Sequence, residues 1–165
     1  MLSASFEAAH IVCEEFDLAI SFRTKEEALQ KLRTLWAMLL ISIGPYGYAG
    51  ELSPGFHWLR FAYAFEAFAA LAILNILYIA LMYRKLSLPA LQGLVRQPDD
   101  PSAIRRWYAS QVVLLASAEC LPLFGLALRL GGNTLSQALP FYFGGAILLL
   151  LLFPRQIPTP ARSST

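Results

Sequence analysis

The sequence predicts an all-α integral membrane protein with about four transmembrane helices, preceded by an N-terminal amphipathic helix. Of its 165 residues, 57% are hydrophobic and 15% are charged, whereas soluble domains carry about 25% charged residues. Apolar runs of near-spanning length recur at about 35–50, 61–83, 107–128 and 135–153. Lys and Arg gather at the ends of these runs, as they do beside membrane spans. We therefore expect a helical arm (1–34), a membrane domain (35–153) and an extended polar tail (154–165).

The arm is expected to begin with an amphipathic helix over residues 1–22. Its apolar stripe, at alternating spacings of three and four, consists of Phe6, Ala9, Cys13, Phe16 and Ile20. Acidic side chains occupy the other faces, and an acidic face is unsuited to anionic lipid, so the arm is expected to pack on another protein surface. His10 lies beside the stripe, where it is read as a packing histidine or as a haem or chlorophyll ligand.

The first span is predicted to continue a helix that starts in the cytoplasm. Thr24 and Glu27 match the capping box of a helix start. The helix then becomes wholly apolar after Arg33, and Gly44-Pro45 is expected to kink or end it. Because 35–50 is shorter than the about 20 residues of a full span, a re-entrant or interfacial helix is the alternative.

The second span, 61–83, is broken only by Glu66 and Asn75. His57, which precedes it beside a tryptophan, fits a membrane interface. It could instead ligate haem or a chlorophyll magnesium, but no predicted span contains a histidine. No His or Cys pair has metal-ligand spacing either. We therefore expect neither a cofactor nor a metal.

Topology follows from the distribution of basic residues. The connection 84–106 is predicted to be a cytoplasmic loop because it carries five basic residues, namely Arg84, Lys85, Arg96, Arg105 and Arg106. The fourth span ends before the polar tail. With both termini inside, every Lys and Arg other than Arg60 and Arg129 is cytoplasmic. The expected location is a bacterial inner membrane, crossed several times.

Glu119 lies near the middle of the third predicted span, 107–128. An ionised carboxylate in hydrocarbon is costly, so Glu119 must be neutral, paired or facing a polar cavity, and it is a candidate functional site. At a rise of about 1.5 Å per residue it lies roughly 13 Å below the outer end of its span, and Glu66 roughly 8 Å. Glu119 and Glu66 are the candidate proton carriers, with Asn75 as a polar neighbour. The two acids either share a proton or each hydrogen-bond another group.

Two short motifs resemble the hairpin of subunit c of F-type ATP synthases. Arg96-Gln97-Pro98-Asp99 is similar to the polar loop of that family, and 118–122, which carries Glu119 and Pro122, is similar to its proton-carrying helix. The resemblance implies that Glu119 alternates between protonated and ionised forms as it meets a partner arginine. It also implies that Arg96, Gln97 and Pro98 form a contact surface. The run 61–83 lacks the family's glycine-rich ribbon.

Two functions fit these observations. The sequence contains no Ser-His-Asp set at plausible depth and no phosphate-binding glycine loop, so an enzyme is not expected. The first hypothesis is a non-catalytic accessory or structural subunit of a larger membrane complex, for example a bioenergetic one. The alternative is a proton-carrying or proton-conducting oligomer built around Glu119. Expected partners are the lipid bilayer and other membrane subunits or further copies of the chain. The net charge of +2 argues against nucleic acid.

Overall fold

The computed structural model describes residues 24–52, 63–97 and 100–154. All regular structure within these ranges is helical, so the all-α prediction is confirmed for them. Several predicted features lie outside the described residues, namely the helix over 1–22 with His10, the turn with His57, Pro98 and most of the tail.

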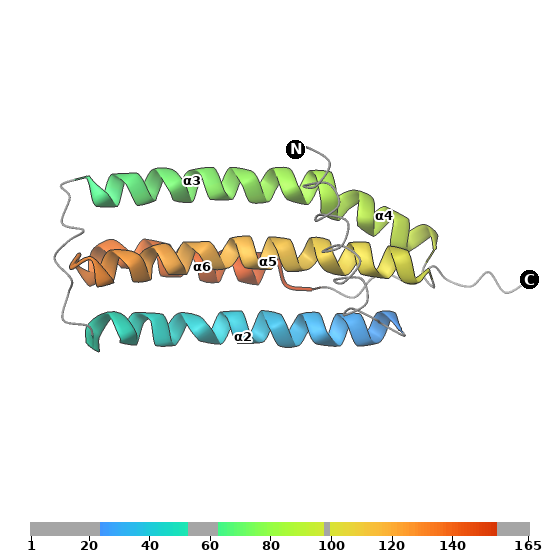
Figure 1. Cartoon of the computed structure of the whole chain (residues 1–165), viewed down its shortest axis with the longest axis horizontal. Helices are drawn as coiled ribbons and strands as arrows, with labels where there is room; N and C mark the ends of the chain where they lie inside the picture. Colours follow the sequence, from blue (N-terminus) through green and yellow to red (C-terminus); the bar gives the residue numbers. More distant parts are fainter. Residues whose placement is uncertain (1–23, 53–62, 98–99, 155–165) are drawn as a thin grey trace, which may run out of the picture.

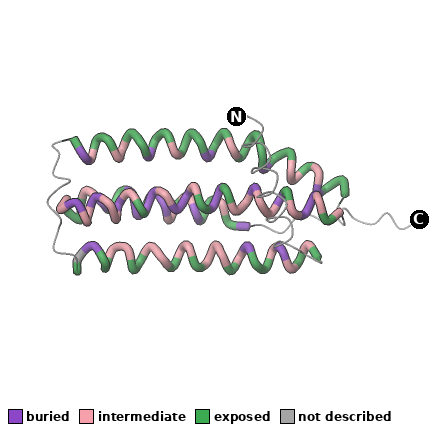
Figure 2. Tube along the Cα trace, in the orientation of Figure 1, coloured by how far each residue is buried: buried purple, intermediate pink, exposed green. Residues whose placement is uncertain are grey.

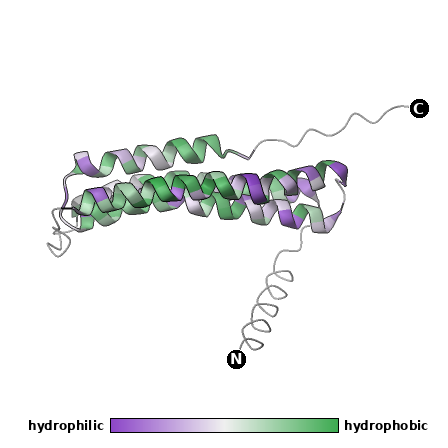
Figure 3. Cartoon of the chain, turned by 90° about the horizontal axis from the view of Figure 1, so that it is seen from above, coloured by the Kyte–Doolittle hydropathy of each residue, from purple (hydrophilic) through white to green (hydrophobic). Residues whose placement is uncertain are grey.

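The chain folds into a bundle with α5 at its centre (Figure 1). The elements are α2 (Lys25–Leu52), α3 (Ala64–Met82), the π-helical turn η2 (Tyr83–Ser87), α4 (Leu88–Arg96), α5 (Pro101–Leu130) and α6 (Leu135–Leu151). In Figure 1, α2 and α3 lie on opposite sides of α5. In the turned view of Figure 3, α6 stands to one side of the other helices. Helix α5 contacts all the other elements, so it positions whatever site the bundle contains.

Two helices are long and apolar enough to cross a membrane. One is the continuous helical run Ala64–Arg96, and the other is Pro101–Leu130. Helix α6 is apolar but has only 17 residues. The run that contains α3 is much less buried within the protein than α5, and Figure 2 shows exposed positions along most of α3.

Helix α2 is longer than its apolar run. It starts after Thr24, whose Oγ1 accepts a hydrogen bond from the Glu27 backbone N–H at 3.2 Å, in agreement with the predicted cap. Gly44-Pro45 does not end the helix, which continues to Leu52. Pro45 is exposed. Of the two predicted outcomes, a kink or an end of the helix, the structure rules out the end.

The predicted loop 84–106 is mostly helical. Helix α3 passes directly into η2 and α4, and α5 begins at Pro101, so only residues 97–100 separate the two helical runs. Pro101 lies in the first turn of α5, where the missing N–H removes no helical bond. Pro89 lies inside the continuous helical run, directly after the π turn. Asp100 caps α5 by accepting hydrogen bonds from the backbone N–H of Ser102 at 3.0 Å and from its hydroxyl at 2.6 Å. Charged residues in this region indicated a loop, but they lie on helices that extend past the apolar runs.

Glycines allow α5 and α6 to approach each other closely. A Cβ on Gly145 would come within 2.3 Å of Pro122 Cδ, and a Cβ on Gly125 within 3.0 Å of the Tyr142 ring. At the end of α2, a Cβ on Gly50 would come within 2.8 Å of Arg129 Cβ. Small residues at these points let helix backbones pack without voids.

Candidate functional site

The Glu119 side chain is enclosed between α5 and α2. Only 6% of Glu119 is exposed. The carboxyl is therefore buried in a part of the chain whose sequence is mostly apolar. Its Oε1 lies 2.6 Å from Ser42 Oγ on α2. Ser42 lies in the apolar part of α2, beyond Trp36, so the acid is held inside the bundle by a single hydroxyl from the neighbouring helix.

The contacts of Ser42 indicate which form of the carboxyl fits the site. Ser42 Oγ lies 2.6 Å from the Leu39 carbonyl oxygen as well as 2.6 Å from Glu119 Oε1. A carbonyl oxygen can only accept, and a serine hydroxyl has one proton. Each contact has its own proton only if Ser42 donates to Leu39 and a protonated Glu119 donates to Ser42. A protonated carboxyl is thus the form in which each of the two contacts has its own proton.

The second oxygen of this carboxyl is unsatisfied. Glu119 Oε2 is buried and has no hydrogen-bond partner among the described residues. In the neutral acid this atom is the carbonyl oxygen, and leaving it unpaired costs about 1–3 kcal/mol. A buried polar atom without a hydrogen bond marks a position where a water, a proton or a donor group from another protein could bind.

Asn75 of α3 bonds the α5 backbone close to Glu119 but does not bond the Glu119 carboxyl. Asn75 Nδ2 donates to the Ser117 carbonyl oxygen at 2.8 Å. This bond holds α3 against α5 two residues before Glu119. Asn75, the predicted polar neighbour of Glu119, therefore bonds the backbone of α5, and the Glu119 carboxyl bonds Ser42 instead.

Glu66 is separated from Glu119. It is exposed and lies in the first turn of α3, where the positive end of the helix dipole stabilises a carboxylate. The bond to Glu119 comes from Ser42 on α2, which lies on the other side of α5 from α3 (Figure 1). The structure therefore does not bring the two acids together, and they share no proton in this arrangement.

The residues of the predicted contact loop lie at the tip between α4 and α5. Arg96 is the last residue of α4, and Gln97 follows it; both are exposed. The Asp100 backbone N–H donates to the Gln97 carbonyl oxygen at 3.3 Å, which closes the turn. Pro98 lies outside the described residues. Arg96 and Gln97 are therefore accessible at the end of the bundle.

Polar side chains join α2, α3, α5, α6 and η2 to one another, and the sequence did not reveal their partners. Besides the two bonds from Ser42 and Asn75, Trp36 Nε1 donates to the Leu149 carbonyl oxygen at 2.7 Å. Gln111 Nε2 donates to Ser87 Oγ at 2.8 Å. These bonds join α2 to α6 and α5 to η2. The available signal was the few polar residues in these apolar runs, but their partners depend on how the helices pack.

Aromatic side chains mark one level across α2 and the end of α6. The rings of Trp36 and Phe153 meet edge to face with centroids 4.9 Å apart, and the Arg33 guanidinium lies 5.8 Å from the Phe153 centroid. Aromatic rings beside a cation are typical of a membrane interface.

Comparisons with protein-family models, curated proteins and solved structures found no match to this chain. Within the described residues, no three His, Cys, Asp or Glu side chains group as a metal site would require. What the arrangement offers chemically is therefore a buried carboxyl with one open oxygen and a set of bonds that fix helix packing.

Proposed function

We propose that the protein crosses a membrane with four helices and serves as a non-catalytic subunit of a larger membrane assembly. The observation that carries this proposal is the surface of α3. Its large exposed side chains are Leu71, Ile73, Leu74, Ile76, Leu77, Tyr78 and Leu81. An apolar surface this continuous marks contact with lipid or with another protein.

Helix lengths are compatible with a common apolar layer. From Trp36 to the end of α2 the rise is about 24 Å, and α6 spans about 25 Å, near the roughly 30 Å of hydrocarbon. Helix α5, with 30 residues, is about 45 Å long, so its first turns extend beyond the layer together with α4. The hydrophilic residues gather at this same end of the bundle (Figure 3).

The orientation follows from the charges at that end. Helix α2 starts there, and α6 runs toward that end but stops about halfway along the bundle (Figures 1 and 3). The basic residues at this end are Lys25, Lys31, Arg33, Arg84, Lys85, Arg96, Arg105 and Arg106, whereas Arg129 lies at the other end. The positive-inside rule places the basic end in the cytoplasm of a bacterial cell, with both chain termini on that side.

The outer face of α3 also has features of a helix-binding surface. Glu66, Ala67 and Ala70 are exposed on it and lie within one turn of each other. Small side chains let another helix approach closely, and a carboxyl in an apolar layer requires a partner. These residues support contact with another subunit in addition to lipid.

The subunit proposal is tested by photo-crosslinking in the native membrane. A photoreactive amino acid at Leu74 of α3, which is 62% exposed, should capture another polypeptide. The matched control is Ile147 of α6, which is 56% exposed, and it should give mainly lipid adducts. Gentle detergent extraction should likewise recover the chain with other polypeptides. A homogeneous monomer on native electrophoresis, without crosslinks from either position, would refute the proposal.

The open Oε2 of Glu119 supports a second candidate, a proton-carrying oligomer similar to subunit c. Because α2 covers the carboxyl, a partner arginine would reach Glu119 only after α2 moves. In proteoliposomes, Glu119→Gln should abolish proton flux, and the exposed-acid control Glu66→Gln should retain it. Hydrophobic carbodiimides should label Glu119, since they react with protonated carboxyls. Unchanged flux in Glu119→Gln would exclude this function.

A further inference from the structure

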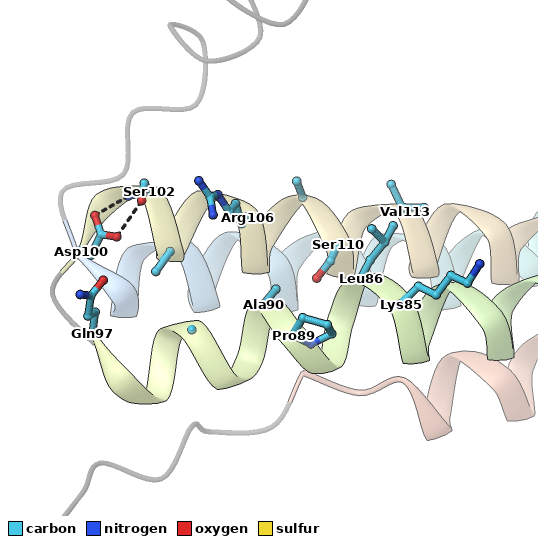
Figure 4. Close-up of a pocket in the computed structure, with 13 residues that line it drawn as sticks. Lys85, Leu86, Pro89, Ala90, Gln97, Asp100, Ser102, Arg106, Ser110 and Val113 are labelled. Carbon is cyan, nitrogen blue, oxygen red and sulfur yellow. Dashed lines mark hydrogen bonds between the residues drawn. The ribbon is translucent and has the colours of Figure 1, made fainter.

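A groove lies between the η2–α4 segment and the first half of α5, at the basic end of the bundle (Figure 4). Its volume is about 510 Å³. Leu86 of η2 and Val113 of α5 line it, and they are 45% and 38% exposed. Each side of the groove therefore presents an apolar side chain that the described residues leave partly uncovered.

The groove lies beyond the apolar layer proposed above, and this step rests on that placement. Helices α2 and α5 both start at the basic end (Figure 1), so they run parallel, and the bond between Ser42 and Glu119 fixes their relative level. Trp36 and Val113 each precede a member of this pair by six residues, so they lie at about the same level. Trp36 marks the membrane interface, and the groove extends from Val113 away from the layer. Its apolar side chains therefore require cover by protein rather than by lipid tails.

The chain that precedes α2 starts at the same end of the groove. Thr24 and Pro101 each lie twelve residues before the interface level, so α2 begins level with the first turn of α5, where Ser102 lines the groove. Residues 1–23, which lie outside the described residues, lead directly into Thr24. As a helix they would be about 35 Å long, whereas 102–113 spans about 17 Å. The segment is therefore long enough to turn back from Thr24 and lie along the groove.

The amphipathic helix predicted over 1–22 is complementary in charge to this end of the bundle. Glu7, Glu14 and Asp17 recur at spacings of seven and three, which places them on one flank of its apolar stripe. The segment 1–22 contains no Lys or Arg. The connection 84–106, which forms the groove, carries five basic residues against two acidic ones. The acidic segment is therefore attracted to the groove.

The cations that line the groove stand at separate levels along it. Arg106 lies between Asp100 and Lys85 (Figure 4), and the charge of Asp100 acts on it. Lys85 is exposed and lies farther from the turn. The acidic flank of a helix over 7–17 extends about 15 Å. An extended partner of this kind can reach Lys85 without requiring the two cations to meet at one point.

We propose that residues 1–22 dock in this groove of the same chain as an amphipathic helix. The apolar stripe lies against Leu86, Ala90 and Val113, and the acidic flank lies toward Lys85. Small residues such as Ala90 let a helix approach closely. A Cβ added to Gly93 would meet nothing within 4 Å, which leaves space for a side chain of the docked helix. The protein surface that the sequence predicts for the arm is thus provided by α4 and α5.

Disulfide trapping through Cys13 tests the docking in the full-length protein in mild detergent. Cys13 belongs to the apolar stripe, and Cys120→Ala removes the only other thiol of the chain. In that background, Ala90→Cys and Gly93→Cys each place a second thiol in the groove, about one turn apart. The matched control is Gln92→Cys, at an exposed position between them that does not line the groove. Oxidation with copper phenanthroline should join Cys13 to position 90 or 93 about tenfold faster than to position 92, because docking raises the effective thiol concentration.

Trypsin identifies the disulfide that forms. It releases Cys13 in the peptide 1–23 and each introduced thiol in the peptide 86–96, so all three variants give the same pair of peptides. Equal parts of unlabelled and ¹⁵N-labelled chains are oxidised together. Pairs of a single isotope show that arm and groove belong to one chain. Mixed pairs would overturn the chain's own arm as the occupant in favour of the arm of a second copy.

A charge variant tests the acidic flank. Lys85→Gln should slow the coupling about threefold, as expected for the loss of an exposed ion pair. Arg84→Gln removes a neighbouring exposed charge that does not line the groove, and it should leave the rate unchanged. Equal slowing by both variants would overturn Lys85 as the partner of the flank.

Two results would overturn the docking itself. One is equal coupling at positions 90, 92 and 93, and the other is no coupling at either 90 or 93. The photo-crosslinks from α3 provide a separate readout of the proposed function. Crosslinks from α3 without coupling in the groove would therefore overturn the docked arm alone.

Discussion

Replacing Glu119 by Gln is the most informative single change in this protein. The Gln amide can donate to Ser42 Oγ as the protonated acid does, and its carbonyl oxygen occupies the position of the unpaired Oε2. All hydrogen bonds of the site are then retained. Glu119→Gln should therefore change the free energy of unfolding by less than about 1 kcal/mol, in line with the modest size of interhelical hydrogen bonds in membranes.

Glu119→Leu removes one stabilising and one destabilising contribution to the free energy of unfolding. It removes the bond to Ser42, worth about 0.6 kcal/mol on average and seldom more than about 1.7. It also removes the unpaired Oε2, which relieves about 1–3 kcal/mol. The net change should lie near zero or be slightly stabilising. Ser42→Ala, by contrast, leaves the carboxyl proton without an acceptor and should destabilise by about 1 kcal/mol.

Equilibrium unfolding in mixed detergent micelles measures these differences. A double-mutant cycle with Ser42→Ala and Glu119→Leu should give a coupling energy of about 0.6–1.7 kcal/mol. The reasoning fails if Glu119→Gln destabilises the protein by about 3–5 kcal/mol, because losses of that size arise when one member of a buried ion pair is removed. Glu119 would then be ionised and paired.

The remaining predictions concern packing and pH. Gly145→Ala, whose Cβ would clash with Pro122, should destabilise the α5–α6 contact by about 1–3 kcal/mol. Gly47→Ala, with nothing within 4 Å, is the control and should stabilise slightly in the same thermal assay. Asn75→Leu should cost about 0.6 kcal/mol in the same assay, and unchanged stability would contradict the role of its bond to α5. The hydrogen bonds from Ser102 hold the pKa of Asp100 below its usual value. The ionised Asp100 therefore stabilises the fold at pH values above its unfolded pKa of about 3.9, and this stabilisation is lost as the pH falls through the lower folded pKa. Asp100→Asn should therefore make the stability of the first turn of α5 depend less on acid pH.

The parts of the fold that could be predicted depend on local sequence. The cap at Thr24 and the apolar positions of α2, α3, α5 and α6 follow from residue type and spacing, and the structure places helices there. The sequence predicts a loop over 84–106 because of its five basic residues, but Arg84 and Lys85 lie in η2, Arg96 ends α4, and Arg105 and Arg106 lie in α5. The same residues are good helix formers, and a helix can continue into water once it leaves an apolar layer.

The partner of Glu119 could not be predicted from the sequence. Depth along the spans suggested Glu66 or Asn75, on the assumption that neighbouring runs pack as a hairpin with these residues facing the acid. The structure does pack α3 against α5, but Asn75 bonds the α5 backbone and the carboxyl faces α2. Ser42 stands among apolar residues, where its hydroxyl gave no distinct signal. Only the arrangement of α2 around α5 identifies it.

The π-helical turn has a consequence for how this chain can vary. A π turn contains one more residue than an α turn, and each residue rotates a helix by about 100°. The wider turn absorbs this residue, so deleting one residue from Tyr83–Ser87 would restore a regular α-helix and leave α4 in nearly the same rotation relative to α3. Deleting a residue from the regular part of α3 would instead rotate α4 by about 100°. The face of α4 that carries Leu94, which is fully buried, would then turn away from the bundle.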